Sequence, residues 1–397
     1  MGGSERYIIN TSEALARRGH HVQVYTTRSV DYRTWRNELP RHEVLDGVDV
    51  RRFESLRRWA YTWRVLDYGY IHYRKERRIR YQPLIMFGSG PLSPGLFLSV
   101  LRRGRDFDVI HVNTLPYAHL WYTAWAAKAI GAPLVITPFL HTQQADIFDV
   151  EWFNAAMRAA DRVVVMTQVE RDYLVQRFVD PARIVMGGVG LEPEEIRRAA
   201  VGGARAQFGI AEEAFAVLFL GRRAAYKGLD TLLEAHLRLR AQRPDATLVL
   251  AGPTEPYWDE LRARYPDVPG LIDLGTVSDE DKARLMSVCD ALALPSTGES
   301  FGIVFCEAWA LGKPVIGVRA GALADMIAEG EDGFLVAPGD AEDLAARLQV
   351  LRDDPALRQR LGRRGYDKVM SRYTVERVTD QVEALYAELA RSKRGPR

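Results

Sequence analysis

Short apolar runs alternate with longer amphipathic stretches along most of the chain, and they fall into two series. The first series occupies residues 22–27, 48–53, 109–112, 134–137 and 162–166. The second occupies residues 216–220, 247–251, 271–274, 291–294, 315–318 and 333–336. The runs have the length of buried strands, and the stretches between them have the length of helices. This alternation predicts an α/β protein with two Rossmann-like, doubly wound domains built on parallel sheets.

A glycine-rich segment that ends in proline, residues 186–193, separates the two series. We interpret it as a hinge and expect the ligand crevice between the two domains. The predicted domains are residues 1–187 and 188–371. Residues 372–397 are predicted to form a C-terminal helix that packs back on the first domain, because an apolar stripe recurs at helical spacing through Val375, Val378, Val382, Leu385 and Leu389.

The composition is that of a globular protein, with 47% hydrophobic and 27% charged residues in a chain of 397. A formal net charge of +2 gives no overall attraction to nucleic acid. The two cysteines, Cys289 and Cys306, lie in apolar contexts, so we expect neither a disulfide framework nor a cysteine zinc site. The sequence contains neither a run of 18 apolar residues nor a signal-peptide pattern. We therefore expect a cytoplasmic protein that is attached, at most, to the inner face of a membrane.

Residues 51–82 break the alternation with ten Arg or Lys, three acids and eight aromatic residues. Basic and aromatic side chains together suit peripheral contact with an anionic membrane surface. They suit a phosphorylated acceptor equally well. The alternative is a solvated helical hairpin whose aromatic side chains pack on the domain.

Two glutamates, Glu299 and Glu307, bracket the most informative stretch of the sequence. Residues 291–294 read as a buried strand, residues 297–300 as the loop after it, and residues 302–311 as a helix. Ligands of open α/β sheets bind beyond the carboxyl ends of the strands, where this loop lies. Glu307 sits in a helix that is apolar nearly all round, so its carboxylate needs a partner. One hydroxyl-rich ligand across the start of the helix could satisfy both glutamates, whereas either alone could be an ordinary surface acid.

A basic loop follows the first strand of the second series. It reads Gly221-Arg222-Arg-Ala-Ala-Tyr-Lys227-Gly228 and leads into a predicted helix. Arg222 and Lys227 thus follow a strand of the same predicted sheet as the strand before Glu299. Together they would make a clamp for a diphosphate, although two loop cations exposed to water are the commoner arrangement.

These motifs in combination resemble the retaining glycosyltransferases of the GT-B class, family 4. The resemblance rests on Gly221-Arg222 with Lys227-Gly228, on Glu299-Ser-Phe-Gly302 with Glu307-Ala308, and on residues 312–315, Gly-Lys-Pro-Val. The opening residues 2–6, Gly-Gly-Ser-Glu-Arg, and residues 18–20, Arg-Gly-His, resemble the family's first loop and helix. These landmarks run through nearly the whole chain.

The resemblance implies a nucleotide-sugar donor held mostly by the second domain, with the first domain on the acceptor side. Arg222 and Lys227 would then hold the diphosphate, Glu299 the sugar hydroxyls and Glu307 the ribose hydroxyls. Further donor contacts would come from Gly3, Gly221, Ser300, Phe301, Gly302 and Ile303. Transfer with retention in this family is thought to pass through an oxocarbenium-like state on one face of the sugar. No metal or other cofactor is implied.

Two histidines of the first domain follow or end predicted strands. His141, in residues 137–142 (Thr-Pro-Phe-Leu-His-Thr), is similar to a family histidine that contacts the donor sugar near the reaction centre. With Glu299, Arg222 and Lys227 it completes the predicted catalytic set. Without the family it would read as a solvated loop histidine. We interpret His111, in residues 110–113 (Ile-His-Val-Asn), as a packed strand histidine.

The sequence departs from the family pattern at its start, because it begins in the glycine loop and not in a hydrophobic strand before it. We expect that absent strand to lie in the middle of the first sheet, where its loss leaves two neighbours with unpaired edges. Our hypothesis is a start that is too late, through truncation or misassigned initiation. The glycine-rich hinge and Asp325 are smaller departures from the family pattern. They affect the expected details of sugar recognition and not the expected reaction.

We therefore predict a retaining, metal-independent glycosyltransferase that moves a hexose from a UDP- or GDP-sugar to a glycan or lipid-linked glycan. Within enzymes, the alternatives are a nucleotide-sugar epimerase or a phosphorylase on the same architecture. The alternative of another class is a noncatalytic partner subunit that keeps the crevice without turnover, which the absent first strand favours.

Overall fold

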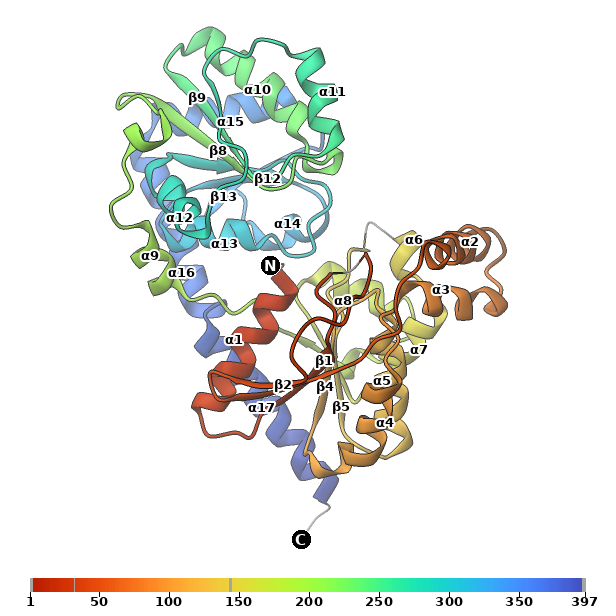
Figure 1. The fold of residues 1–397 in the computed structure, drawn as a ribbon. Coiled ribbons are helices and arrows are strands. Elements are labelled where there is room, and N and C mark those ends of the chain that lie inside the picture. The colour runs from red at the N-terminus through yellow and green to blue at the C-terminus, as the bar shows by residue number, and fades with distance from the viewer. Residues whose placement is uncertain (1–2, 32, 143–144, 395–397) are drawn as a thin grey trace. The chain divides into compact units, whose positions relative to one another are not determined.

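The computed structural model describes residues 3–31, 33–142 and 145–394, and it divides into two compact units (Figure 1). The first unit contains the chain up to Gly190 and again from Val375 onward, and the second contains Leu191–Thr374. The predicted domain borders, at 187/188 and 371/372, fall three residues before these positions.

The second unit is a six-stranded parallel sheet in the order β10-β9-β8-β11-β12-β13. Each strand coincides with a predicted apolar run to within one residue at either end. Residues on both faces of β8, β9, β11, β12 and β13 are buried, as expected for a parallel sheet covered on both sides. The strands are β8 (Phe215–Leu220), β9 (Ala246–Ala251), β10 (Leu271–Asp273), β11 (Ala291–Ala293), β12 (Val315–Val318) and β13 (Gly333–Val336).

Two groups of helices flank this sheet (Figure 1). One group contains α10 (Leu229–Gln242), α11 (Pro256–Arg264) and α15 (Ala341–Asp353). The other contains α9 (Pro193–Ala200), α12 (Asp279–Val288), α13 (Ile303–Ala310), α14 (Gly321–Met326) and α16 (Pro355–Arg372). Both cysteines, Cys289 and Cys306, are free and buried in this unit, as predicted for small core residues.

The first unit contains two separate sheets, whereas we predicted one parallel sheet whose absent central strand leaves two neighbours with unpaired edges. One is three-stranded in the order β1-β3-β2, with β2 antiparallel to β3, and the other is four-stranded and parallel in the order β4-β5-β6-β7. Each of β1 and β4 is therefore an end strand, because no strand among the described residues pairs with its second side. Two strands, β2 and β7, escaped prediction because they are short and partly exposed. The strands are β1 (Gln23–Thr27), β2 (His42–Leu45), β3 (Val48–Phe53), β4 (Ile110–Asn113), β5 (Leu134–Thr137), β6 (Arg162–Val165) and β7 (Ile184–Met186).

The helices of the first unit include the last one in the sequence, α17 (Val375–Arg394), which packs beside α1 (Gly3–Arg17). Arg18 forms ion pairs with Asp380 and Glu383 of α17, at 2.8 and 2.6 Å. The predicted opening loop is wrong for Gly3 to Arg6, which form the first turn of α1; Glu5 there suits the positive end of the helix dipole. Gly2 lies outside the described residues. The other helices are α2 (Ala60–Glu76), α3 (Gln82–Ser89), α4 (Pro94–Arg103), α5 (Ala118–Ala129), α6 (Ala145–Phe148), α7 (Glu151–Ala159) and α8 (Gln168–Val175).

In the basic, aromatic segment 51–82, some aromatic side chains pack on the unit, as the helical-hairpin interpretation predicted, and others stay exposed. Its helix α2 packs on α3 and buries Tyr70 and Tyr73, and Tyr81 is buried just beyond it. Arg58, counted among the basic surface residues, is buried between the rings of Trp35 and Trp63 and donates to the Gly88 carbonyl. The aromatic side chains that stay exposed are Trp59, Tyr61, Trp63 and Tyr68.

Within the described ranges, no single helix is both long and apolar enough to span a membrane. One pair of shorter segments, Ile79–Ser89 and Pro94–Asp106, passes the same test of length and composition together, with a bend of 100° between them.

Candidate functional site

The centre of the sheet in the second unit is where its strand order reverses. The chain runs from β8 outward through β9 to β10, and β11 returns to the other side of β8 before β12 and β13 continue outward. β8 and β11 are parallel neighbours, so the loops that follow them leave from the same edge of the sheet. Such a reversal is the usual ligand site of open α/β sheets. The loop after β8 is the one predicted to carry the diphosphate clamp. The loop after β11 is the one predicted to carry Glu299.

Lys227 and Glu299 meet between the two loops. The Lys227 Nζ donates to Glu299 Oε1 at 2.5 Å, and only 13% of each side chain is exposed. A pair this sheltered from water is held more strongly than an ordinary surface ion pair. The sheet of the second unit thus brings together two of the residues that the sequence singled out.

The backbones of the two loops interlock around Tyr226. The Thr297 N–H donates to the Tyr226 carbonyl at 2.9 Å. A Cβ at Gly228 would lie 2.1 Å from the Pro295 carbonyl oxygen, and one at Gly298 would lie 2.6 Å from the Tyr226 ring. Gly228 also has φ +67°, a backbone conformation that favours glycine. It is the residue that directly precedes α10. The distance between Lys227 and Glu299 is therefore fixed by close backbone packing.

Arg222, the other cation of the predicted clamp, does not join this pair. Its guanidinium donates to Glu255 at 3.1 Å and to the Tyr226 hydroxyl at 2.8 Å, and 60% of its side chain is exposed. The Arg222 guanidinium and the Lys227 ammonium lie 5.9 and 5.2 Å from the centre of the Tyr226 ring. A long, exposed arginine can swing toward an anion, whereas Lys227 is already held in place.

The next residue, Arg223, is a buried structural anchor that the sequence did not reveal. It makes a two-pronged ion pair with Asp273 and lies over the Trp258 ring at 4.7 Å. Burial acts to raise the pKa of Asp273, but the hydrogen bonds from Arg223 and the Gly275 N–H, together with the positive charges of Arg223 and Arg262, outweigh it and hold that pKa below its ordinary value. Two adjacent arginines look alike in sequence, and only packing separates the anchor from the residue near the site.

Glu307 is buried as predicted, but its partner in this structure is a lysine. Only 9% of the residue is exposed, and Lys282 of α12 donates to its Oε1 at 2.8 Å. Lys282 lies in the first turns of α12, which is capped by the Ser278 hydroxyl and begins with three acids. Sequence reasoning missed Lys282, because its position on a separate helix gave no signal of a contact with α13.

The other predicted donor contacts of this unit lie around the start of α13. Gly302 precedes α13 with φ +88°, Ile303 is its first residue, and the buried Phe301 ring packs edge-on against Tyr373 at 5.3 Å. Within the described part of the chain, the backbone N–H groups of Phe301 and Gly302 have no hydrogen-bond partner. Gly221 follows β8 directly, and Ser300 is half-buried in the loop. Unpaired N–H groups at the start of a helix favour anionic oxygens.

The remaining predicted residues, His141 and Gly3, belong to the first unit. His141 follows β5, and its ring lies 5.4 Å from that of Phe148. The loop is anchored one residue earlier, where the Leu140 N–H donates to Glu170 at 2.7 Å. Burial raises the pKa of Glu170 to about 7, against three backbone N–H groups that lower it. Glu170 also closes the capping box of α8 with Thr167, and Thr-x-x-Glu is the signal that could have found it.

His111 is the packed strand histidine that we predicted. It bonds through one ring nitrogen to the Tyr386 hydroxyl of α17 and through the other to the Thr137 hydroxyl. Burial lowers its pKa to about 4, so the ring is neutral over the physiological range.

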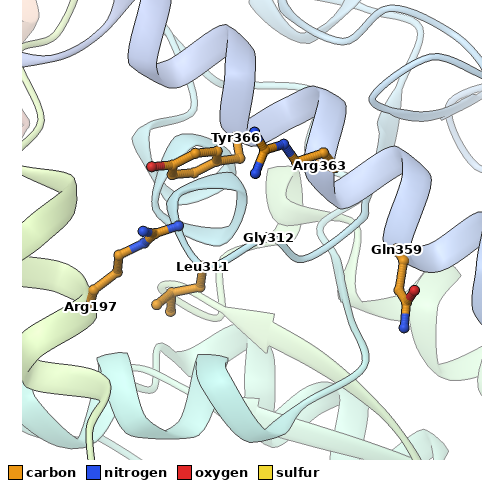
Figure 2. Close-up of a pocket in the computed structure, with 6 residues that line it drawn as sticks. All are labelled: Arg197, Leu311, Gly312, Gln359, Arg363 and Tyr366. Carbon is orange, nitrogen blue, oxygen red and sulfur yellow. The ribbon is translucent and has the colours of Figure 1, made fainter.

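A shallow cavity of about 390 Å³ lies elsewhere in the second unit (Figure 2). Arg197 reaches from α9 toward Tyr366 of α16, where its guanidinium lies 4.2 Å from the ring centre, and Arg363 lies on the other side of that ring (Figure 2). None of the predicted site residues lines it. The lining residues are Arg197, Leu311, Gly312, Gln359, Arg363 and Tyr366.

Two family models match the chain, one over each half. Residues 2–190 match the glycosyl transferase 4-like domain, and residues 203–368 match the glycosyl transferases group 1.

Similar curated proteins span nearly the full length of the chain. The D-inositol 3-phosphate glycosyltransferase of Saccharomonospora viridis is 29% identical over 426 aligned positions, which cover 99% of this chain and 91% of that protein. The protein of the same name from Thermomonospora curvata is 30% identical over 402 positions, covering 91% of this chain and 84% of that protein.

Solved structures resemble the fold over the same length. The sucrose-phosphate synthase of Thermosynechococcus elongatus has a TM-score of 0.72 at 24% identity and covers 98% of this chain and 94% of its own. HepE of Anabaena, crystallised with UDP and glucose, has a TM-score of 0.67 at 21% identity and covers 97% of this chain and 96% of its own. At these identities the likeness concerns the fold.

Proposed function

Because the chain belongs to the group 1 glycosyltransferases of the GT-B class and is expected to use a nucleotide sugar, we propose that it transfers a hexose with retention from a UDP- or GDP-sugar. The observation that carries this proposal is the sheltered pair of Lys227 and Glu299 at the strand-order reversal of the second unit. A cation beside a hydroxyl-binding carboxylate suits the junction of a diphosphate and a sugar.

Donor binding would exchange the partners of this pair. The diphosphate takes the ammonium of Lys227, and Arg222 swings from Glu255 to join it. Glu299 is then released to accept hydrogen bonds from the sugar hydroxyls, because a carboxylate offers only acceptors and hydroxyls are donors. Glu307 accepts from the ribose hydroxyls in the same way. The unpaired N–H groups of Phe301 and Gly302 lie in the same loop as Glu299 and suit the phosphate oxygens.

The reaction breaks the bond between the anomeric carbon and the phosphate oxygen and forms a bond from that carbon to an acceptor oxygen. Lys227 and Arg222 stabilise the negative charge that develops on the departing phosphate. That phosphate takes the acceptor's proton on the same face of the sugar, which gives retention without a protein nucleophile. His141 is assigned to the donor sugar near the reaction centre. We propose that no metal takes part, since the two cations supply the positive charge.

We propose a glycan or lipid-linked glycan as acceptor, and the exposed face of α2 supports the lipid-linked form. Tyr61, Tyr68 and Ile71 follow one another at helical spacing on that face, and Arg64 and Lys75 lie in the same stripe. Basic and aromatic side chains in one row suit the headgroup region of an anionic membrane. Contact there would hold the protein at the inner face of the membrane.

A second acceptor class, an inositol phosphate, is favoured by the names of the similar proteins. The two similar proteins described above are both named D-inositol 3-phosphate glycosyltransferases. The choice between acceptors turns on a few contacts, which identities near 30% do not fix.

The test is transfer by the purified protein from UDP- and GDP-sugars to lipid-linked glycans and to inositol phosphate, with the anomeric configuration of the product read by NMR. In Lys227→Ala we expect the rate to fall by roughly 10²- to 10³-fold, the usual cost of losing one charge that stabilises a transition state. Addition of EDTA should leave the wild-type rate unchanged.

The matched control is Lys128→Ala, which removes a surface lysine paired with Asp161. Its rate should equal that of the wild type. The proposal fails if Lys227→Ala transfers as fast as the wild type, or if folded wild-type protein is inert with every donor and acceptor. Conversion of the donor to a second nucleotide sugar without any acceptor would indicate an epimerase instead.

A further inference from the structure

Lys282 touches the buried carboxylate of Glu307 and has no role in the proposed chemistry so far. Its Nζ lies 2.8 Å from Glu307 Oε1, and 24% of its side chain is exposed against 11% for that of Glu307. Its other acidic neighbour is Asp279, at 3.8 Å and with a side chain that is 83% exposed. The contact with Asp279 is therefore a loose surface pair, and Lys282 is directed mainly at Glu307.

The neighbours of Glu307 along α13 are apolar. Phe305, Cys306, Ala308 and Trp309 of the same helix are buried. Across the ranges that the structure describes, Lys282 is the one polar side chain that contacts Glu307. A carboxylate in such a place is costly to bury without a partner, so removal of the lysine would leave Glu307 without the contact that holds it in place.

The pair occupies only one oxygen of Glu307. Oε1 accepts from Lys282, and within the described residues Oε2 has no hydrogen-bond partner. An ionised carboxylate can accept several hydrogen bonds and donates none. Oε2 is thus a fixed acceptor that is left for a hydroxyl group.

We propose that Lys282 is a positioning residue for nucleotide recognition, which holds Glu307 oriented so that its second oxygen binds a ribose hydroxyl. The inference rests on the proposed function, because that function assigns Glu307 to the ribose. It adds that recognition of ribose depends on a second helix, α12, through a residue that does not touch the nucleotide.

The consequence is discrimination between a ribonucleotide and its deoxy form. A nucleotide without the hydroxyl leaves a buried carboxylate oxygen unpaired, which a site built for hydrogen bonding tolerates poorly. Without Lys282 the carboxyl group loses its fixed orientation, and it should bind both forms about equally. A residue that merely stabilised the fold would leave the ratio of the two affinities unchanged.

The experiment measures dissociation constants by calorimetry for UDP, GDP and ADP, and then for the 2′-deoxy and 3′-deoxy forms of the diphosphate that binds best. The wild type should bind the ribonucleotide roughly ten- to a hundredfold more tightly than one deoxy form. In Lys282→Met that ratio should approach one, chiefly through loss of affinity for the ribonucleotide. Lys282→Arg, which keeps the cation, should retain most of the ratio.

Two controls separate this role from a structural one. Arg284→Met removes another cation of α12, whose partners are the surface acids Glu280 and Asp281, and should leave the ratio intact. Combining Lys282→Met with Glu307→Gln should weaken ribonucleotide binding no further than Glu307→Gln alone, since both changes act through one carboxylate.

The outcomes are distinguishable. If folded Lys282→Met keeps the wild-type ratio, the inference is overturned while the proposed function stands. Should Lys282→Met fail to fold, Lys282→Ala takes its place, because it also removes the hydrogen-bond donor, and an unchanged ratio there overturns the inference equally. If the wild type binds none of the three diphosphates, the proposed function fails and the inference fails with it.

Discussion

At the scale of single residues, the site of the second unit consists of two lysine–glutamate pairs. Lys227 holds Glu299, and Lys282 holds Glu307. In both, a carboxylate predicted to bind ligand hydroxyls is charge-compensated before any ligand arrives. Sequence reasoning found three of these four residues, because loop motifs after strands carry a recognisable pattern. It missed Lys282, since a side-chain contact between separate helices leaves no trace in the local sequence.

His111 provides a prediction for the pH dependence of stability. Burial depresses its pKa from 6.5 in the unfolded chain to about 4 in the folded protein. Between those values the unfolded state binds more protons, so the free energy of unfolding should fall as the pH is lowered from 6.5 to 4, by roughly 3 kcal/mol at most. His111→Gln keeps a polar side chain without this titration, and its stability should fall less.

Urea unfolding of both proteins at pH 7, 5.5 and 4.5, followed by tryptophan fluorescence, measures the effect. The difference in unfolding free energy between wild type and His111→Gln should shift in favour of the variant as the pH falls. Parallel curves would show that His111 is not neutral and buried in solution.

At the scale of elements, α2 shows how one helix serves two surfaces. Thr62, Leu66 and Tyr73 lie on its buried face against the unit, whereas Tyr61, Tyr68 and Ile71 lie on its exposed face. The sequence marked the segment as unusual but could not divide its aromatic residues between the two faces. That division depends on the packing of α3 against one side of α2.

The exposed face of α2 predicts binding to anionic vesicles. The protein should sediment with phosphatidylglycerol-containing vesicles at low salt and should be released as salt is raised, because screening weakens the attraction of the arginines and lysine. Ile71→Asp places a negative charge in the apolar row and should reduce binding severalfold.

Phe178→Asp is the matched control, since Phe178 is an exposed aromatic residue outside α2. It should bind as the wild type does. Sedimentation that is indifferent to lipid charge, or an equal loss in both variants, would remove the proposed membrane contact.

At the scale of the whole molecule, the end of the sequence returns to the unit in which it began. Buried residues Val375, Val378, Val382, Leu385 and Leu389 form one stripe of α17, and Tyr386 reaches His111 of β4. The stripe could be seen in the sequence, but the surface that covers it could not.

Val382→Asp tests this assignment. A charge in place of a buried valine should lower the free energy of unfolding of the first unit by more than about 3 kcal/mol. The adjacent exposed residue serves as control, because Gln381→Asp should change it by less than about 0.5 kcal/mol. Scanning calorimetry with and without UDP distinguishes the units, since a nucleotide bound at the proposed site would raise the melting temperature of the second unit. A shift of that nucleotide-sensitive transition in Val382→Asp would contradict the assignment.

The sequence by itself determined the class of fold, the six strands of the sheet in the second unit, and the two loops that carry Lys227 and Glu299. These follow from local patterns, because a buried parallel strand is continuously apolar and a ligand loop begins where the strand stops. The order of strands then brought the two loops together.

Only the tertiary structure decided which charges meet. It separated Arg223, buried on Asp273, from the exposed Arg222, and it gave Glu307 its partner Lys282. It also divided the first unit into two sheets and placed α17 beside α1. The physical reason is common to all these cases. Pairing of charges, edges and apolar stripes depends on distances between segments far apart in the chain, and local sequence patterns do not contain those distances.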